Sequence, residues 1–145
     1  MQSGKDAKEK QVKKTVTLTN QQIIDGQAGL NILAGQKMAI VPGFSVAKNK
    51  AAIAPHAKDY HDYRNQILKR HAQADSRGNV AISNGLVLFE TPEAEAAAVA
   101  ELAELGEIEV AVEIRTLALA ALGEVEVEPN VLGALEWMFD EEEGE

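Results

Sequence analysis

Hydrophobic and polar positions recur with two different periods along the chain, and these periods predict both strands and helices. Residues 15–18 alternate with the two-residue period of a strand. Residues 19–22 then read Thr-Asn-Gln-Gln, a capping-box pattern that predicts a helix beginning at Asn20. This helix has apolar residues along one side and three glycines, each of which weakens it by about 1 kcal/mol relative to alanine. The apolar residues are Ile23, Ile24, Ala28, Ile32 and Leu33, and the glycines are Gly26, Gly29 and Gly35.

The longest helical pattern covers residues 46–72. Pro42-Gly43 predicts a turn before it, and Ser45 is a suitable N-cap. Pro55 lies inside the pattern, so we expect the helix to be kinked or divided there. A stripe at three- and four-residue spacing is expected to face a core or a partner helix. Its members are Ile53, His56, Tyr60, Tyr63, Ile67 and His71.

A hairpin of two short strands and two further strands are predicted in the second half of the chain. In residues 80–90 the dipeptide Asn84-Gly85 separates two apolar runs, which indicates a hairpin. Residues 108–115 alternate strictly between apolar and polar or small side chains, and residues 124–128 repeat this pattern more briefly.

Two more helices follow from their start signals. Thr91-Pro92-Glu93 reads as an N-cap followed by a first-turn proline, and this helix is expected to end near Leu105, before Gly106. Pro129 is expected to begin a last helix that continues through Phe139. The predicted fold is α+β, with a small antiparallel sheet, made of the hairpin and the strands at 108–115 and 124–128, covered by three or four helices.

The predicted organisation is a flexible basic arm at residues 1–14, a single α+β domain at residues 15–139 and an acidic tail at residues 140–145. No segment approaches 18 consecutive apolar residues and no signal-peptide pattern is present, so we expect no membrane partner. Aromatic residues make up 4% of the chain, which predicts a thin core that an oligomer would help to stabilise.

Charge is divided by position. Thirteen of the 14 Lys and Arg residues lie in residues 1–80, and 17 of the 23 Asp and Glu residues lie in residues 81–145. This division favours a role in binding and allows head-to-tail homo-oligomers in which a basic surface meets an acidic one.

No catalytic motif is recognisable, so we predict a protein that is not an enzyme and has no cofactor. The chain has no cysteine, its serines lie in no activating context, and its glycines lack the spacing of a phosphate loop. A metal site in the long helix is a further alternative, built on His56, Asp59 and His61. However, His56 and His61 lie about 140° apart around a helix, so packing and solvent exposure explain these residues better.

The basic half offers a candidate ligand site. Its lysines and arginines can attract phosphate groups, and two tyrosines can stack on bases, so a phosphorylated ligand or a nucleic acid is a candidate partner. An ordinary helix surface with two core tyrosines is the competing interpretation. The candidate residues are Lys48, Lys50, Tyr60, Tyr63, Arg64, Lys69 and Arg70.

The last helix offers a candidate partner surface. Trp137, Met138 and Phe139 are the apolar anchors that a subunit contact needs, and they equally suit the domain's own core.

Several short segments of the sequence resemble a known family. They are residues 108–117, Leu119, Leu122, Gly123, Val125-Glu126-Val127 and residues 132–138, together with Leu18-Thr19-Asn20, Ala47-Lys48-Asn49 and Tyr63-Arg64-Asn65. In these segments the chain resembles small uncharacterised phage and prophage proteins, and the resemblance covers most of residues 15–139. The resemblance implies a virus-encoded accessory protein with a small α+β domain, and it transfers no catalytic residue.

Three hypotheses for function follow. The leading one is a phage-encoded binding protein that sequesters or blocks a host protein, such as a component of defence or nucleic-acid machinery, in the host cytoplasm during infection. The alternative is a structural or assembly component of the virion. The second alternative is a metal-dependent enzyme that uses His56, Asp59 and His61.

Overall fold

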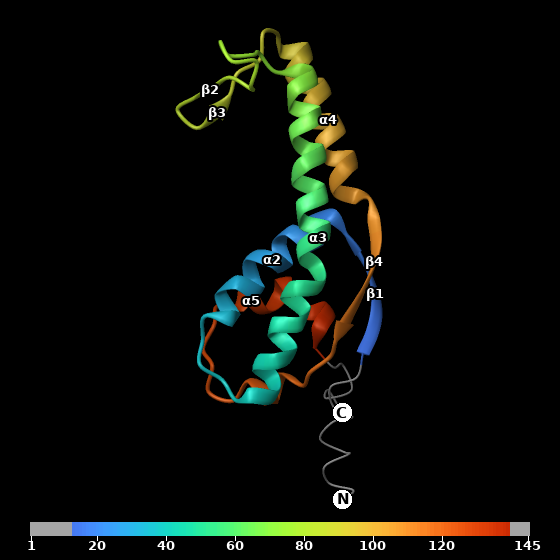
Figure 1. Ribbon diagram of the computed structural model, residues 1–145, viewed down its shortest axis with the longest axis vertical. Helices are drawn as coiled ribbons and strands as arrows, with labels where there is room; N and C mark the ends of the chain where they lie inside the picture. Colours follow the sequence, from blue (N-terminus) through green and yellow to red (C-terminus); the bar gives the residue numbers. More distant parts are fainter. Residues whose placement is uncertain (1–12, 140–145) are drawn as a thin grey trace, which may run out of the picture. The chain divides into compact units, whose positions relative to one another are not determined.

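The computed structural model describes residues 13–139 and has an α+β fold, in which four α-helices accompany two small antiparallel sheets (Figure 1). In chain order the elements are β1 (Lys13–Thr19), α2 (Asn20–Ala34), α3 (Ile40–His71), β2 (Ile82–Ser83), β3 (Leu86–Val87), α4 (Pro92–Glu107), β4 (Glu109–Arg115), the 3-10 helix η1 (Leu119–Leu122), α5 (Pro129–Ala134) and the 3-10 helix η2 (Glu136–Met138). Contacts divide the described residues into two compact units: residues 13–57 with 109–139 form unit 1, and residues 58–108 form unit 2.

The sheet of unit 1 is a two-stranded ribbon. β1 pairs antiparallel with β4, in a register that places Lys13 opposite Arg115 and Thr19 opposite Glu109. Leu18, Val112 and Ile114 are buried on one face, which Lys14 shares at the start of β1, and the other polar residues of both strands lie on the opposite face, as strand alternation requires.

The hydrophobic core of unit 1 is formed by side chains from α2, the first half of α3, the ribbon and the C-terminal segment. Seven of its members are completely inaccessible to solvent: Ile23, Leu30, Leu33, Ile53, Ala57, Leu135 and Met138. The capping box predicted for Asn20 is present, because the Thr19 hydroxyl accepts from Gln22 N–H and the Gln22 side chain accepts from Thr19 N–H.

Two glycines of α2 allow the C-terminal segment to approach closely. A Cβ atom on Gly26 would lie 2.9 Å from Cζ2 of Trp137, and one on Gly29 would lie 3.2 Å from Cγ of Leu135. These glycines weaken the helix and yet are needed, since any larger residue would displace core side chains.

Unit 2 contains the second half of α3, a small hairpin and α4. β2 and β3 pair antiparallel around the Asn84-Gly85 turn, in which both residues have positive φ angles, 53° and 79°. α4 begins at the predicted N-cap, where Thr91 Oγ1 accepts from Ala94 N–H at 3.0 Å, and it ends at Glu107, two residues beyond the predicted end. Across residues 13–139, no helix is both long enough and apolar enough to cross a membrane.

The structure corrects the prediction for the start of the long helix and excludes one of the two outcomes expected at Pro55. Pro42-Gly43 is not a turn and Ser45 is not an N-cap, because α3 already begins at Ile40 and a proline in its first turn removes no needed donor. Pro55 lies inside α3 and does not divide it.

The predicted sheet is also different. The hairpin forms its own sheet, and β4 pairs instead with β1. The strand predicted at residues 124–128 is wrong. Val125 and Val127 are partly buried against the core of unit 1 without a strand partner, so their alternation with glutamates reflects burial of one side and not strand pairing. The last helix ends at Ala134, and a separate 3-10 turn follows it. Of the predicted basic arm, Lys13 and Lys14 belong to β1 and the rest lies outside the described residues, as does the tail at 140–145.

Candidate functional site

The first half of α3 has one buried and one exposed face, and the buried face fixes the helix in unit 1. Ser45, Val46, Asn49 and Ile53 recur at three- and four-residue spacing and are at most 1% exposed. Asn49 carries the main polar contact: its Nδ2 donates to Arg115 O at 2.9 Å, and its Oδ1 accepts from Arg115 N–H at 2.7 Å. One side chain therefore satisfies both backbone groups at the end of β4 and ties that strand to α3.

The exposed face of the same helix half is apolar. Its residues follow a spacing of four, three, four and three, the repeat of a coiled-coil seam. Ile40 is 88% exposed and Phe44 50% exposed, and the three alanines after them are also exposed. We call this surface the α3 seam; it consists of Ile40, Phe44, Ala47, Ala51 and Ala54.

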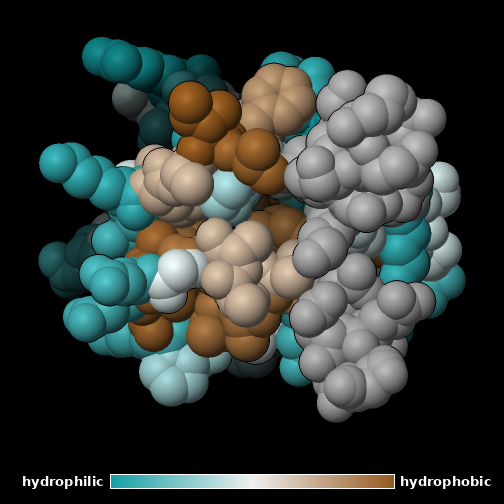
Figure 2. Space-filling view, turned by 90° about the horizontal axis from the view of Figure 1, so that it is seen from below, coloured by the Kyte–Doolittle hydropathy of each residue, from teal (hydrophilic) through white to brown (hydrophobic). Residues whose placement is uncertain are grey.

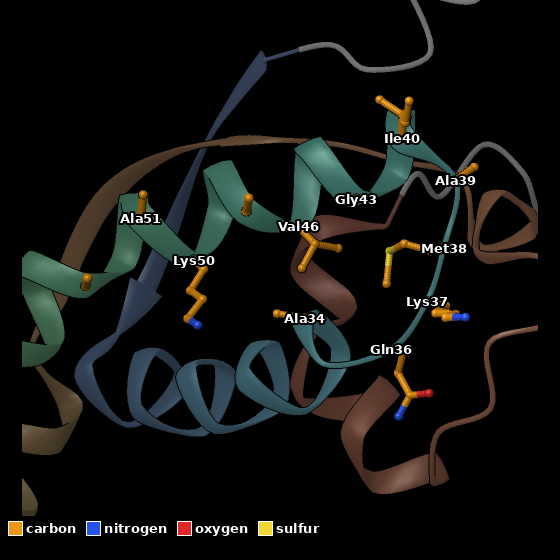
Figure 3. Close-up of a pocket in the computed structure, with 12 residues that line it drawn as sticks. Ala34, Gln36, Lys37, Met38, Ala39, Ile40, Gly43, Val46, Lys50 and Ala51 are labelled. Atoms are coloured by element: carbon orange, nitrogen blue, oxygen red, sulfur yellow. The ribbon is translucent and has the colours of Figure 1, made fainter.

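A groove lies beside the α3 seam, between the start of α3, the end of α2 and the connection at residues 35–39. Its volume is about 700 Å³. Figure 3 shows Val46 and Lys50 directed from α3 into this groove, and Met38 of the connection directed into it as well. Ala34, Gln36 and Lys37 line its opposite side. The groove is thus apolar at its centre and cationic at its rim.

Lysines flank the α3 seam on both sides. Lys48 directly follows Ala47, and Lys50 directly precedes Ala51, which are the e and g positions of the heptad. Neither lysine forms an ion pair within residues 13–139. Lys48 Nζ lies 5.8 Å from the centre of the Phe44 ring, and Arg115 Cζ lies 5.3 Å from it. Phe44 is therefore a half-exposed aromatic side chain with two cations near its ring.

Apolar side chains gather on the face seen from the end at which α3 begins (Figure 2). In unit 1 four large apolar residues are at least half exposed, namely Ile40, Val41, Phe44 and Leu119. Such exposed apolar surface favours an interaction site.

The structure divides the ligand residues that the sequence predicts between the two units. Lys48 and Lys50 lie in unit 1, at the α3 seam. In unit 2, Tyr63 and Arg70 line a cavity of about 440 Å³, in which Arg70 is paired with Glu101 at 3.2 Å. The remaining candidates, Tyr60, Arg64 and Lys69, also lie in unit 2, on α3, and do not line that cavity.

The candidate partner residues of the last helix belong to the core region of unit 1. Met138 is completely buried, and Trp137 and Phe139 are partly buried and packed against the core. The Trp137 indole donates from Nε1 to Ala134 O at 2.9 Å. Binding of a partner by these residues stays a prediction, and it can involve only the partly buried Trp137 and Phe139.

The residues of the metal alternative lie on α3 but do not form a group of ligands. His56 lies in unit 1, whereas Asp59 and His61 lie in unit 2 and are exposed. The His61 ring packs edge-on against Tyr60, with ring centres 5.4 Å apart. The neighbouring Asp62 accepts a hydrogen bond from Lys58 at 2.7 Å, which raises the pKa of the Lys58 ammonium above its usual value. Within residues 13–139 no three acidic, histidine or cysteine side chains are grouped as metal ligands.

The α3 seam was not predicted from the sequence, although its spacing is present there. The four-three spacing of Ile40, Phe44, Ala47, Ala51 and Ala54 is visible in the sequence, but the turn assigned to Pro42-Gly43 removed the first two positions from the helix. Comparisons with protein-family models, curated proteins and solved structures find no match to this chain.

Proposed function

We propose that this protein is a non-catalytic binding protein of the phage accessory class that its sequence resembles, and that it captures a host protein by docking one acidic amphipathic helix on the α3 seam. The host cytoplasm during infection is the proposed place of capture. The observation that carries the proposal is the α3 seam itself, five outward apolar residues with coiled-coil spacing.

The lysines beside the α3 seam support an acidic partner. In an antiparallel pair of α3 helices from two copies, e positions face e positions and g positions face g positions. Lys48 would then lie near Lys48 of the second copy and Lys50 near its Lys50, so like charges oppose this self-pairing. A helix with glutamates at its e and g positions would instead place carboxylates beside both lysines.

The size of the α3 seam supports a single docked helix. From Ile40 to Ala54 it extends for about 20 Å along α3. Three of its five residues are alanines, which let a second helix approach closely and place larger side chains in the groove beside Val46 and Met38. An interface of this size is expected to bind with a Kd on the order of micromolar.

A peptide-binding measurement tests the proposal. The probe is a synthetic helical peptide with Leu and Ala at a and d and Glu at e and g, and the control peptide has Lys at e and g. Isothermal titration should detect binding of the Glu peptide and little binding of the Lys peptide. Lys48→Glu combined with Lys50→Glu should reverse this preference.

Matched variants distinguish specific binding at the α3 seam from non-specific binding to other surfaces. Ala51→Glu adds a carboxylate to the α3 seam, whereas Ala103→Glu makes the same change at an exposed alanine of α4. We expect Ala51→Glu to abolish binding of the Glu peptide and capture of host protein from a lysate, and Ala103→Glu to retain both. Equal effects of the two variants, or large assemblies of the purified protein without any partner, would contradict the proposal; the assemblies would favour a virion component.

A further inference from the structure

A second cavity of unit 1 lies between α3 and the end of β4, and we call it the Arg115 cleft. Its volume is about 320 Å³. Lys13 of β1, Lys48 of α3 and Arg115 of β4 line it, with Glu113 as the one lining carboxylate. Within residues 13–139 none of the three cations forms an ion pair. Positive charge therefore exceeds negative charge around this cavity.

The strand register brings two of these cations together. Lys13 is directly opposite Arg115 in the ribbon. Both backbone groups of Arg115 bond to Asn49, so this is a non-hydrogen-bonded pair, the kind in which opposite side chains approach most closely. Like charges in such a pair destabilise a sheet, and an anion bound between them would remove that repulsion.

Arg115 is also held in position. Asn49 fixes its backbone, and its guanidinium carbon lies 5.3 Å from the centre of the Phe44 ring, which Lys48 Nζ approaches to 5.8 Å. An arginine with a fixed planar guanidinium suits bidentate binding of an oxyanion. Phe44 is 50% exposed, so part of its ring remains open to a flat group.

We propose that the Arg115 cleft binds the phosphate group of a mononucleotide, with Lys13, Lys48 and Arg115 around the phosphate and the base against Phe44. A volume of about 320 Å³ is at the lower end of the range for small-ligand sites, which suits one nucleotide. This site shares Lys48 and Phe44 with the α3 seam, so a nucleotide and a docked helix would compete, but binding of the nucleotide does not require the helix.

Titration of the full-length protein with three probes tests the assignment, with amide chemical shifts measured by NMR at low salt. The probes are adenosine monophosphate, inorganic phosphate and adenosine. We expect adenosine monophosphate to bind most tightly and to shift the amides of residues 44–52 and 113–115. Binding of adenosine as tight as that of its monophosphate, or no binding by any probe up to about 5 mM, would overturn the proposal. Phosphate binding as tight as that of the nucleotide would overturn the place given to the base.

Neighbouring lysines of β1 provide a matched control. Lys13 lines the Arg115 cleft, whereas Lys14 is the next residue and lies on the other face of the ribbon. Lys13→Gln and Arg115→Gln are each expected to weaken binding of adenosine monophosphate about tenfold, and Lys14→Gln to change it less than about twofold. If Lys14→Gln weakens binding as much as Lys13→Gln, the affinity is general attraction to positive charge and the proposed site is wrong.

Discussion

Unit 1 and unit 2 differ in how much apolar surface they bury. Fourteen buried apolar residues form one cluster in unit 1, whereas the buried apolar residues of unit 2 are Ile67, Leu68, Ala98 and Leu105. Because hydrophobic stabilisation grows with the buried apolar area, we expect unit 1 to resist unfolding and unit 2 to open more readily. Both proposed binding surfaces lie on unit 1, whose packed core can hold their side chains in place.

Polar contacts follow the same division. In unit 1 the buried Asn49 side chain satisfies two backbone groups of a strand. In unit 2 the ion pairs Lys58–Asp62 and Arg70–Glu101 are largely exposed to solvent. Exposed ion pairs contribute little to stability, whereas an unsatisfied buried polar group is costly, so polar substitutions should matter more in unit 1.

The largest expected effect is the loss of a core leucine from unit 1. Leu135 is completely buried against α2, so Leu135→Ala should lower the free energy of unfolding by about 4 kcal/mol, measured by urea denaturation. Leu105→Ala in unit 2 should act locally, increasing hydrogen exchange within residues 58–108 while leaving the amides of β1 and β4 protected. Equal exchange throughout the chain in both variants would show that the two units unfold together.

The next effect comes from Asn49. Asn49→Leu keeps a side chain of similar volume but leaves Arg115 N–H and Arg115 O without their partner, which should cost about 3 kcal/mol in urea denaturation. Asn31→Leu, at an exposed position of α2, is the control and should stay within about 0.5 kcal/mol. A cost for Asn49→Leu as small as that of the control would mean that water satisfies the end of β4.

Local signals in the sequence predicted the elements that local interactions determine. The capping box at Thr19, the Asn84-Gly85 turn and the N-cap at Thr91 all depend on residues within three positions of one another, and the structure confirms each of them. The α+β class also followed from the two periods of the pattern.

The sheet could not be predicted in the same way, because its strands are far apart in the sequence. β1 ends at Thr19 and β4 begins only at Glu109, and alternation alone does not specify which strands pair. Residues 124–128 show the converse: Val125 and Val127 alternate with exposed glutamates because they cover a core, without any strand partner.

The candidate site was missed for a related reason. Pro42 and Gly43 are typical of a turn, yet a proline is also well accommodated in the first turn of a helix. Lys48 and Lys50 were predicted from their charge, but the alanines between which they lie carry no chemical signal of their own. The hydrogen bonds of Asn49 to the backbone of Arg115 could not be predicted from the sequence, because they depend on the tertiary fold.

Two glycines of unit 1 test how tightly its core is packed. Gly26→Ala would place a Cβ atom 2.9 Å from Trp137, so we expect a loss of about 2 kcal/mol in the free energy of unfolding. Gly133→Ala meets no atom within 4 Å and lies in α5, so it should raise stability by up to about 1 kcal/mol. Thermal unfolding of both variants tests this pair, and a Gly26→Ala protein as stable as the wild type would show that Trp137 can move away.

The smallest expected effects compare a real helix cap in unit 2 with an apparent one in unit 1. Thr91 caps α4 through its hydroxyl, so Thr91→Ala should cost about 1 kcal/mol and show as faster exchange of the Ala94 amide. Ser45 is a suitable N-cap by sequence, but its hydroxyl is buried within α3 without a hydrogen-bond partner among residues 13–139. Ser45→Ala therefore removes an unsatisfied polar group and should leave stability unchanged or slightly raised. A loss of about 1 kcal/mol in Ser45→Ala would mean that the helix starts at Ser45 in solution, which would remove Ile40 and Phe44 from the α3 seam.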